Sequence, residues 1–169
     1  TIFTIHNVLI MALHKLLEDD FDKDVYSLLA IHCDTEDYRL AYLLNQYLSI
    51  NLKRCANDLD FKYTTALYSI YEWEDHNKET MWNLIENIFK REEESLASSG
   101  SLFNTSSKII KTFNLIPEYK KVNYFLKIEN DNNIDIKIII NKIQKIPQVV
   151  AVYDIDVLTL KSKNNLIFN

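Results

Sequence analysis

Glu72 and Glu74 have residue types and a spacing that could support catalysis or metal binding. They flank Trp73 and precede Asp75. Residues i and i+2 of a strand lie on one face about 7 Å apart, a separation that suits a pair of catalytic carboxylates or a metal site. Acidic side chains at a strand end also prevent edge-to-edge pairing of sheets. We favour this second interpretation, and an enzyme that uses Glu72 and Glu74 remains an alternative.

His32, Cys33 and Asp34 lie where a predicted strand passes into a predicted helix. A helix N-terminus lowers the pKa of a nearby thiol, so Cys33 could be a nucleophile with His32 as its base. Adjacent residues on a strand point to opposite faces, however, which argues against a direct pair. A buried cysteine followed by an N-cap aspartate is the simpler interpretation. We therefore predict no catalytic residue here.

Asp34, Tyr38 and Arg39 form a candidate ligand site at the start of the same helix. The positive end of a helix dipole attracts anions, and Arg39 adds a charge that could hold a small anionic metabolite. Lys120 and Lys121 could contribute from elsewhere in the chain. The alternative is ordinary surface charge.

Metal and cofactor sites find little support in the sequence. The usual zinc spacings are absent, since the ligand types are scattered over His6, His14, His32, His76, Cys33 and Cys55. The chain has one glycine, whereas phosphate-binding loops and dinucleotide fingerprints need several. We therefore expect neither a metal nor a cofactor.

The composition is that of one soluble domain. The chain has 169 residues and a formal net charge of −5, which disfavours a nucleic-acid surface. No apolar run approaches the roughly 18 residues of a membrane helix. Two cysteines favour a reducing compartment, so we expect a cytoplasmic protein. Met11 resembles a natural start, which predicts that residues 1–10 lie outside a single domain of residues 11–169.

Hydrophobic patterning predicts two helices and at least five strands. Residues 25–32 form an apolar strand, and a helix follows from an N-cap at Asp34 or Thr35 to about Ser49. Residues 63–74 and 80–87 alternate as the arms of a hairpin, although 80–87 also matches a helical period. Residues 90–107, which contain the glycine, are predicted to be a mobile loop.

The C-terminal part repeats the pattern of strand, helix and strand. Pro117 interrupts an extended segment at 111–118, residues 122–128 form a strand, and 134–146 form a helix that Pro147 ends. A short strand follows at 149–154. The order is the β-α-β-β-α-β string of a ferredoxin-like fold with extra strand material. We therefore predict an α+β domain, an antiparallel sheet with two helices on one face.

Residues 116–124 resemble the signature that names the IPExxxVDY family. Ile116, Pro117, Glu118, Val122 and Tyr124 match it, and Asn123 stands where the family has aspartate. Residues 38–45, 71–75 and 160–168 are also similar to stretches of the family. The resemblance covers the chain from about Met11 to its C-terminus.

The resemblance implies a small bacterial protein of the cytoplasm, from the Bacteroidota, and implies no activity. Asn123 bears on the role of the signature, because an amide neither ionises nor acts as a base. A structural role for the signature is therefore favoured over a catalytic one.

These observations leave three functions open. The leading hypothesis is a non-enzymatic domain that binds a protein partner or forms a homo-oligomer through a sheet edge or face, since strand aromatics are abundant and no catalytic motif stands out. The second is a ferredoxin-like regulatory domain that binds an anionic metabolite at Asp34, Tyr38 and Arg39. The third is an enzyme that uses Glu72, Glu74 or Cys33.

Overall fold

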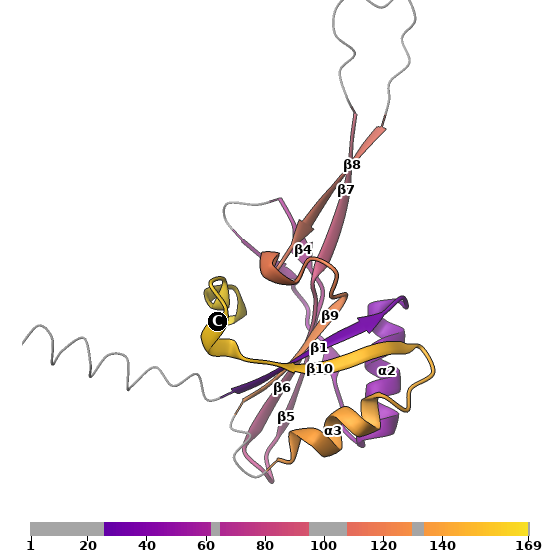
Figure 1. The fold of residues 1–169 in the computed structure, drawn as a ribbon, viewed down its shortest axis with the longest axis vertical. Coiled ribbons are helices and arrows are strands. Elements are labelled where there is room, and N and C mark those ends of the chain that lie inside the picture. The colour runs from indigo at the N-terminus through magenta and orange to yellow at the C-terminus, as the bar shows by residue number, and fades with distance from the viewer. Residues whose placement is uncertain (1–25, 62–64, 95–107, 130–133, 169) are drawn as a thin grey trace, which may run out of the picture.

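A computed structural model describes residues 26–61, 65–94, 108–129 and 134–168. The predicted extension at residues 1–10 lies outside these ranges, as does the part of the predicted loop at 95–107. Within the described residues the chain forms an α+β fold with an antiparallel sheet and two α-helices (Figure 1).

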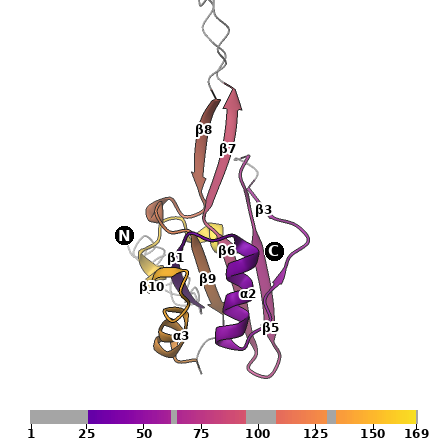
Figure 2. The same ribbon diagram turned by 90° about the vertical axis from the view of Figure 1, so that its right-hand side faces the viewer.

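The main sheet has six strands in the order β10-β1-β9-β6-β5-β2, and each neighbouring pair is antiparallel. Its strands are β1 (Tyr26–Cys33), β2 (Lys53–Arg54), β5 (Ile70–Asp75), β6 (Thr80–Glu86), β9 (Tyr124–Glu129) and β10 (Val149–Ile155). Two further pairs are β3 (Leu59–Asp60) with β4 (Leu67–Tyr68), and β7 (Ile88–Glu94) with β8 (Lys108–Asn114). The β7–β8 ribbon projects from the body of the protein (Figures 1 and 2).

The helix α2 (Asp37–Leu48) buries a stripe of Leu40, Ala41, Leu44 and Leu48. Its N-cap is Glu36, which makes no side-chain capping bond, so the predicted cap at Asp34 or Thr35 is wrong. The chain needs three residues to turn away from β1 before the helix begins. Ser49 ends α2 in the left-handed region, as helix C-termini commonly do.

The helix α3 (Ile136–Ile143) is shorter than the predicted segment at 134–146. Asp135 caps its first turn by accepting from the N–H groups of Lys137 and Ile138, at 2.9 and 3.4 Å. Ile139 and Ile143 are its buried residues. Three short 3₁₀ turns complete the described elements: η1 (Pro117–Tyr119), η2 (Val157–Thr159) and η3 (Lys163–Leu166).

Both faces of the sheet are buried. Successive residues of a strand point to opposite faces, so Leu29 and Ile31 pack with both helices while Leu28 and Ala30 pack on the other side. The second face is covered by side chains from β4, the loop before β9 and the C-terminal segment, including Tyr68, Ile116, Leu160 and Leu166. The prediction that both helices cover one face of the sheet is confirmed.

Two further sequence interpretations differ from the structure. The helical alternative for residues 80–87 is wrong, because β6 pairs along its length with β5 and β9. The predicted loop at 90–107 begins too early, since residues 90–94 belong to β7 and pair with β8. Residues 90–94 show no alternation of apolar and polar side chains, because this part of the ribbon projects from the body and buries neither face against a core.

Asn87 joins the main sheet to the projecting ribbon. Its side chain is fully buried, and its amide donates to the carbonyls of Tyr119 and Val122 at 2.9 and 2.8 Å. Its Oδ1 accepts from the Ile116 N–H at 2.9 Å. Its backbone donates to Asn123 and accepts from Leu115. One side chain and its backbone thus satisfy five polar groups of residues 115–123, of which the Tyr119 carbonyl also accepts from the Val122 N–H.

Replacing Asn87 with alanine should destabilise the protein severely. Three side-chain hydrogen bonds are lost and their backbone partners stay buried, so we expect a loss of about 3–5 kcal/mol in the free energy of unfolding. Urea denaturation measures it. Asn114→Ala removes one exposed bond to the Lys120 carbonyl and should cost less than about 1 kcal/mol. Equal effects of the two substitutions would contradict the role assigned to Asn87.

Candidate functional site

A cleft of about 350 Å³ lies at the end of the sheet where β1 passes into α2. Its walls come from that turn, from the β6–β7 junction and from the start of β9: Cys33, Asp34, Thr35, Glu86, Ile88, Phe89, Lys90, Asn123 and Tyr124. Of the predicted ligand residues, Asp34 lines this cleft. Tyr38 and Arg39 are exposed on α2 and do not line it. The structure thus does not gather Asp34, Tyr38 and Arg39 into one pocket.

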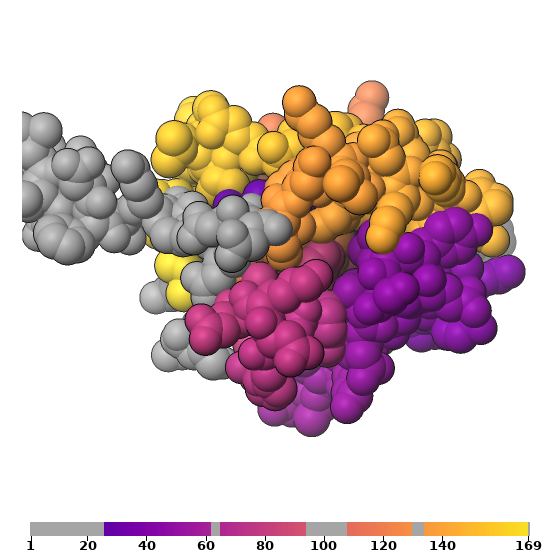
Figure 3. Space-filling view, turned by 90° about the horizontal axis from the view of Figure 1, so that it is seen from below, coloured from indigo at the N-terminus to yellow at the C-terminus, as the bar shows by residue number. Residues whose placement is uncertain are grey.

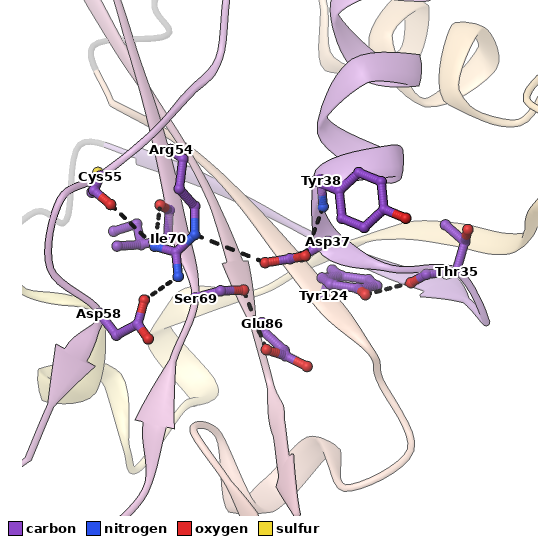
Figure 4. Close-up of polar contacts among 10 residues, drawn as sticks. All are labelled: Thr35, Asp37, Tyr38, Arg54, Cys55, Asp58, Ser69, Ile70, Glu86 and Tyr124. Carbon is purple, nitrogen blue, oxygen red and sulfur yellow. Dashed lines mark hydrogen bonds and ion pairs between the residues drawn. The ribbon is translucent and has the colours of Figure 1, made fainter.

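Arg54 organises the charges beside the cleft (Figure 4). It forms an ion pair with Asp58, and its Nε lies 3.9 Å from Asp37 Oδ2 at the start of α2. Its Nη1 donates to the carbonyls of Cys55 and Ile70, at 3.2 and 3.3 Å. The guanidinium therefore holds β2 against β5 and α2. Its charge is already shared by two carboxylates, which leaves little attraction for an anionic ligand.

Tyr71 lies under the same guanidinium, 5.5 Å from its centre. Burial raises the pKa of Tyr71 to about 12, and the negative charge of Asp37 adds to this. The phenol is therefore neutral at physiological pH. It completes a packed polar cluster rather than supplying a base.

Glu86 is the half-buried carboxylate of the cleft. Its Oε2 accepts from Ser69 Oγ at 3.2 Å (Figure 4). Burial raises the pKa of Glu86, and the charges of Asp37 and Asp58 raise it further, while the Ser69 hydroxyl opposes them. Asp34 and Glu86 outnumber Lys90, the one cation in the lining, so the cleft carries a net negative charge. This charge disfavours the anionic metabolite expected at the start of the helix.

Cys33 is buried, and burial raises the pKa of its thiol, with Asp34 adding to the effect. A thiol with a raised pKa is a poor nucleophile at neutral pH. Its neighbour His32 is directed elsewhere, with Nε2 3.3 Å from the Tyr153 hydroxyl on β10. The arrangement lacks the activated thiol and adjacent base that covalent catalysis needs.

The predicted carboxylate pair is engaged locally. Glu72 accepts from Asn83 Nδ2 at 3.3 Å, and Glu74 lies 3.3 Å from His76 Nδ1. Asp75 accepts from the Asn77 N–H in the turn that follows. Within the described ranges, no group of three or more histidine, cysteine, aspartate or glutamate side chains is placed to hold a metal ion.

The residues of the signature make structural contacts. Ile116 and Val122 are buried, and the N–H of Ile116 binds Asn87. Glu118 accepts from the N–H groups of Lys161 and Ser162 at 2.8 and 2.9 Å and from the Ser162 hydroxyl at 2.6 Å, which lowers the pKa of Glu118. The segment that follows Pro117 therefore holds the C-terminal part of the chain.

Asn123 and Tyr124 connect the signature to the turn between β1 and α2. Asn123 Oδ1 accepts from the Cys33 N–H at 3.1 Å, and the Tyr124 hydroxyl donates to the Thr35 carbonyl (Figure 4). Burial and the charge of Glu86 raise the pKa of Tyr124, which keeps this donor protonated. An aspartate at position 123 has the same acceptor, so either residue suits the contact.

Comparison with models of protein families, with curated proteins and with solved structures found no match. The resemblance to the IPExxxVDY family therefore rests on the residues of the sequence. Among the described residues, neither helix has the length and apolar character needed to cross a bilayer. The protein is therefore an α+β protein in which Arg54 forms ion pairs with Asp37 and Asp58 beside the cleft.

Glu86→Gln should stabilise the protein at pH 7. Because burial raises the pKa of Glu86, the folded protein holds this proton more tightly than the unfolded chain does. Protonated Glu86 is tolerated in the fold, so the protein has its full stability below the unfolded pKa of about 4.3. Part of that stability is lost as the pH rises through the folded pKa and the buried carboxyl ionises. We expect a gain of about 0.5–1.5 kcal/mol at pH 7 that vanishes near pH 4.

Urea denaturation across this pH range measures the effect, and Glu79→Gln in the exposed turn before β6 is the control. A gain that is independent of pH would contradict the explanation by ionisation.

Asn123→Asp and Asn123→Ala test whether position 123 acts by accepting the hydrogen bond from the Cys33 N–H. Alanine removes the acceptor for the Cys33 N–H and should cost about 1–2 kcal/mol of unfolding free energy. Aspartate keeps the acceptor and should cost less than half as much, even beside Glu86. Equal losses in urea denaturation would show that the hydrogen bond to Cys33 is not what position 123 supplies.

Proposed function

We propose that the protein is a non-enzymatic domain that associates with a second copy of itself through the edge strand β10. One observation carries the proposal: the two edges of the main sheet differ sharply. In the part of the chain that the structure describes, no strand pairs with the outer side of β10. The sequence of this strand, Val-Val-Ala-Val-Tyr-Asp-Ile, contains a single charge.

The opposite edge carries the features that prevent association. Its last strand, β2, has two residues, Lys53 and Arg54, both charged and exposed. The neighbouring β5 carries two exposed carboxylates, Glu72 and Glu74. Short edge strands and charges block edge-to-edge pairing, whereas a longer apolar edge favours it. On β10, Val150 is 82% exposed and Tyr153 is 39% exposed.

The charges beside β10 favour a second copy as the partner. Asp154 and Asp156 lie at its C-terminal end, and Lys145 precedes its N-terminal end. Tyr124 is level with Ile31 and therefore with Val152, so Lys120 and Lys121 also lie toward the Val149 end. Antiparallel pairing about a two-fold axis places the lysine end of one copy beside the acidic end of the other.

A bulge limits the length of this pairing. The register of β1 and β10 shifts between His32 and Cys33, so Val150 has no partner residue on β1. Bulges twist an edge strand and restrict its pairing. We therefore propose that residues 151–155 form the ladder between the copies and that Val150 packs against its flank.

Three broader features belong to the same proposal. Membership of the IPExxxVDY family is supported by the signature residues. A ferredoxin-like core is supported by the antiparallel order β10-β1-β9-β6 with α2 and α3 in the connections. A cytoplasmic location is supported by two free thiols, Cys33 and Cys55. An experimental structure with another strand order would overturn the ferredoxin-like core.

Tyr153→Lys should abolish self-association. We expect the wild-type chain to form a dimer in light scattering coupled to size exclusion at roughly 100 μM, and the variant to be monomeric because lysine on an edge strand opposes pairing. Val150→Lys should weaken the dimer in the same way.

The matched control is Leu158→Lys. Leu158 is 77% exposed but lies in η2 beyond the strand, so this variant should remain dimeric. A wild-type chain that stays monomeric up to millimolar concentration would overturn the proposal, as would a dimer that both edge substitutions leave intact.

A further inference from the structure

A hollow of about 240 Å³ lies on the helix side of the protein, away from the cleft and from β10. It is bounded by the C-terminal end of α2, the hairpin of β5 and β6, and the start of α3. Figure 3 looks onto this face, where the three segments surround a recess. The volume suits a compound with a single ring rather than a nucleotide.

Both tryptophans of the chain line this hollow. Trp73 and Trp82 are opposite each other in the ladder of β5 and β6, with ring centres 5.9 Å apart and an angle of 48°. The indole N–H of Trp82 already donates to Thr80 Oγ1 at 3.0 Å. Trp82 is buried with 5% of its surface exposed, so the half-buried Trp73 offers most of the apolar ring surface, which an aromatic ring contacts favourably in stacked or edge-to-face geometry.

Ile138 supplies a second apolar wall. It projects from the first turn of α3 and is 53% exposed, although it lines a concave surface. A flat apolar group in the hollow would cover Ile138 and the indoles together. Burial of apolar surface is the dominant favourable contribution to such binding.

The two lysines at the rim favour an anionic ligand. Lys78 and Lys142 both line the hollow, and within the described residues neither ammonium group has an ion-pair partner. Asp75 and Asp135 also line the rim and keep their negative charge, but Asp135 accepts two backbone N–H groups as the cap of α3 and Asp75 accepts one from Asn77. The two ammonium groups are therefore the rim groups that a ligand carboxylate can pair with.

We propose that this hollow binds a small aromatic carboxylate, with its ring against Trp73 and Trp82 and its carboxylate at Lys78 and Lys142. The site does not involve β10 and is independent of self-association. None of the three functions left open by the sequence placed a ligand here, because the anionic metabolite was expected at Asp34, Tyr38 and Arg39. The proposed ligand is again a small anion, but its site lies in another part of the fold.

Tryptophan fluorescence tests the proposal directly, because both fluorophores lie in the site. Phenylacetate should change the emission saturably, with a Kd on the order of 0.1–1 mM for a ligand of this size. Benzyl alcohol, which lacks the charge, should bind at least about fivefold more weakly, and phenethylamine more weakly still.

Substitutions then locate the carboxylate. Lys142→Gln and Lys78→Gln should each weaken phenylacetate at least about threefold and leave benzyl alcohol unchanged. Lys137→Gln, exposed on α3 and outside the hollow, is the matched control and should change neither. A non-saturating titration, tighter binding of phenethylamine, or equal effects of Lys142→Gln and Lys137→Gln would each overturn the proposal.

Discussion

The hydrogen bonds of Asn87 are the constraint on which the rest of the structure depends. A strand that leaves one sheet for a projecting ribbon must break its ladder, and the backbone groups released there lie in the core. Asn87 satisfies them from a single position, through both ends of its amide and through its own N–H and carbonyl. The cost of an unpaired buried group explains why a polar side chain with no exposed surface is stable here.

Further contacts follow from the position that Asn87 imposes on residues 115–123. Asn123 and Tyr124 reach the turn after β1, and Glu118 reaches the backbone of Lys161 and Ser162. The C-terminal segment is also held by Lys127, whose buried ammonium donates to the Leu166 carbonyl at 2.7 Å and pairs with Glu129. It lies over the rings of Tyr26 and Phe168. The second face of the sheet is thus closed by polar anchors as well as by apolar packing.

Strand alternation and helical stripes were readable from the sequence because burial imposes them locally. The strand at 25–32, the hairpin around the turn after Asp75 and the helix ended by Ser49 follow from such patterns. The role of Asn87 could not be predicted from such patterns, because its partners lie about thirty residues further along the chain and no local pattern marks them. The cap of α2 did not follow either, because Asp34 and Thr35 are of the residue types preferred at an N-cap and Glu36 is not.

The candidate site was partly predictable for the same reason. Cys33 and Asp34 do line a cleft at the start of α2, but Glu86 joins them from a strand that pairing alone brings near. The two tryptophans had a local signal: a hairpin whose last pair is Asp75 with Thr80 must place Trp73 opposite Trp82. What the hairpin could not reveal is α3, which brings Ile138 and Lys142 to the same hollow from the other half of the chain.

Electrostatics decide between the sites that the fold offers. In the cleft, Glu86 and Asp34 place negative charge beside groups whose pKa values burial already raises, so the protein holds Cys33, Tyr124 and Glu86 toward their neutral forms. The net negative charge of this site disfavours anions. At β10 and at the hollow, by contrast, apolar surface lies beside lysine and aspartate side chains. Burial of that apolar surface is favourable and the neighbouring charges select the partner, which is the combination that binding requires and that the cleft lacks.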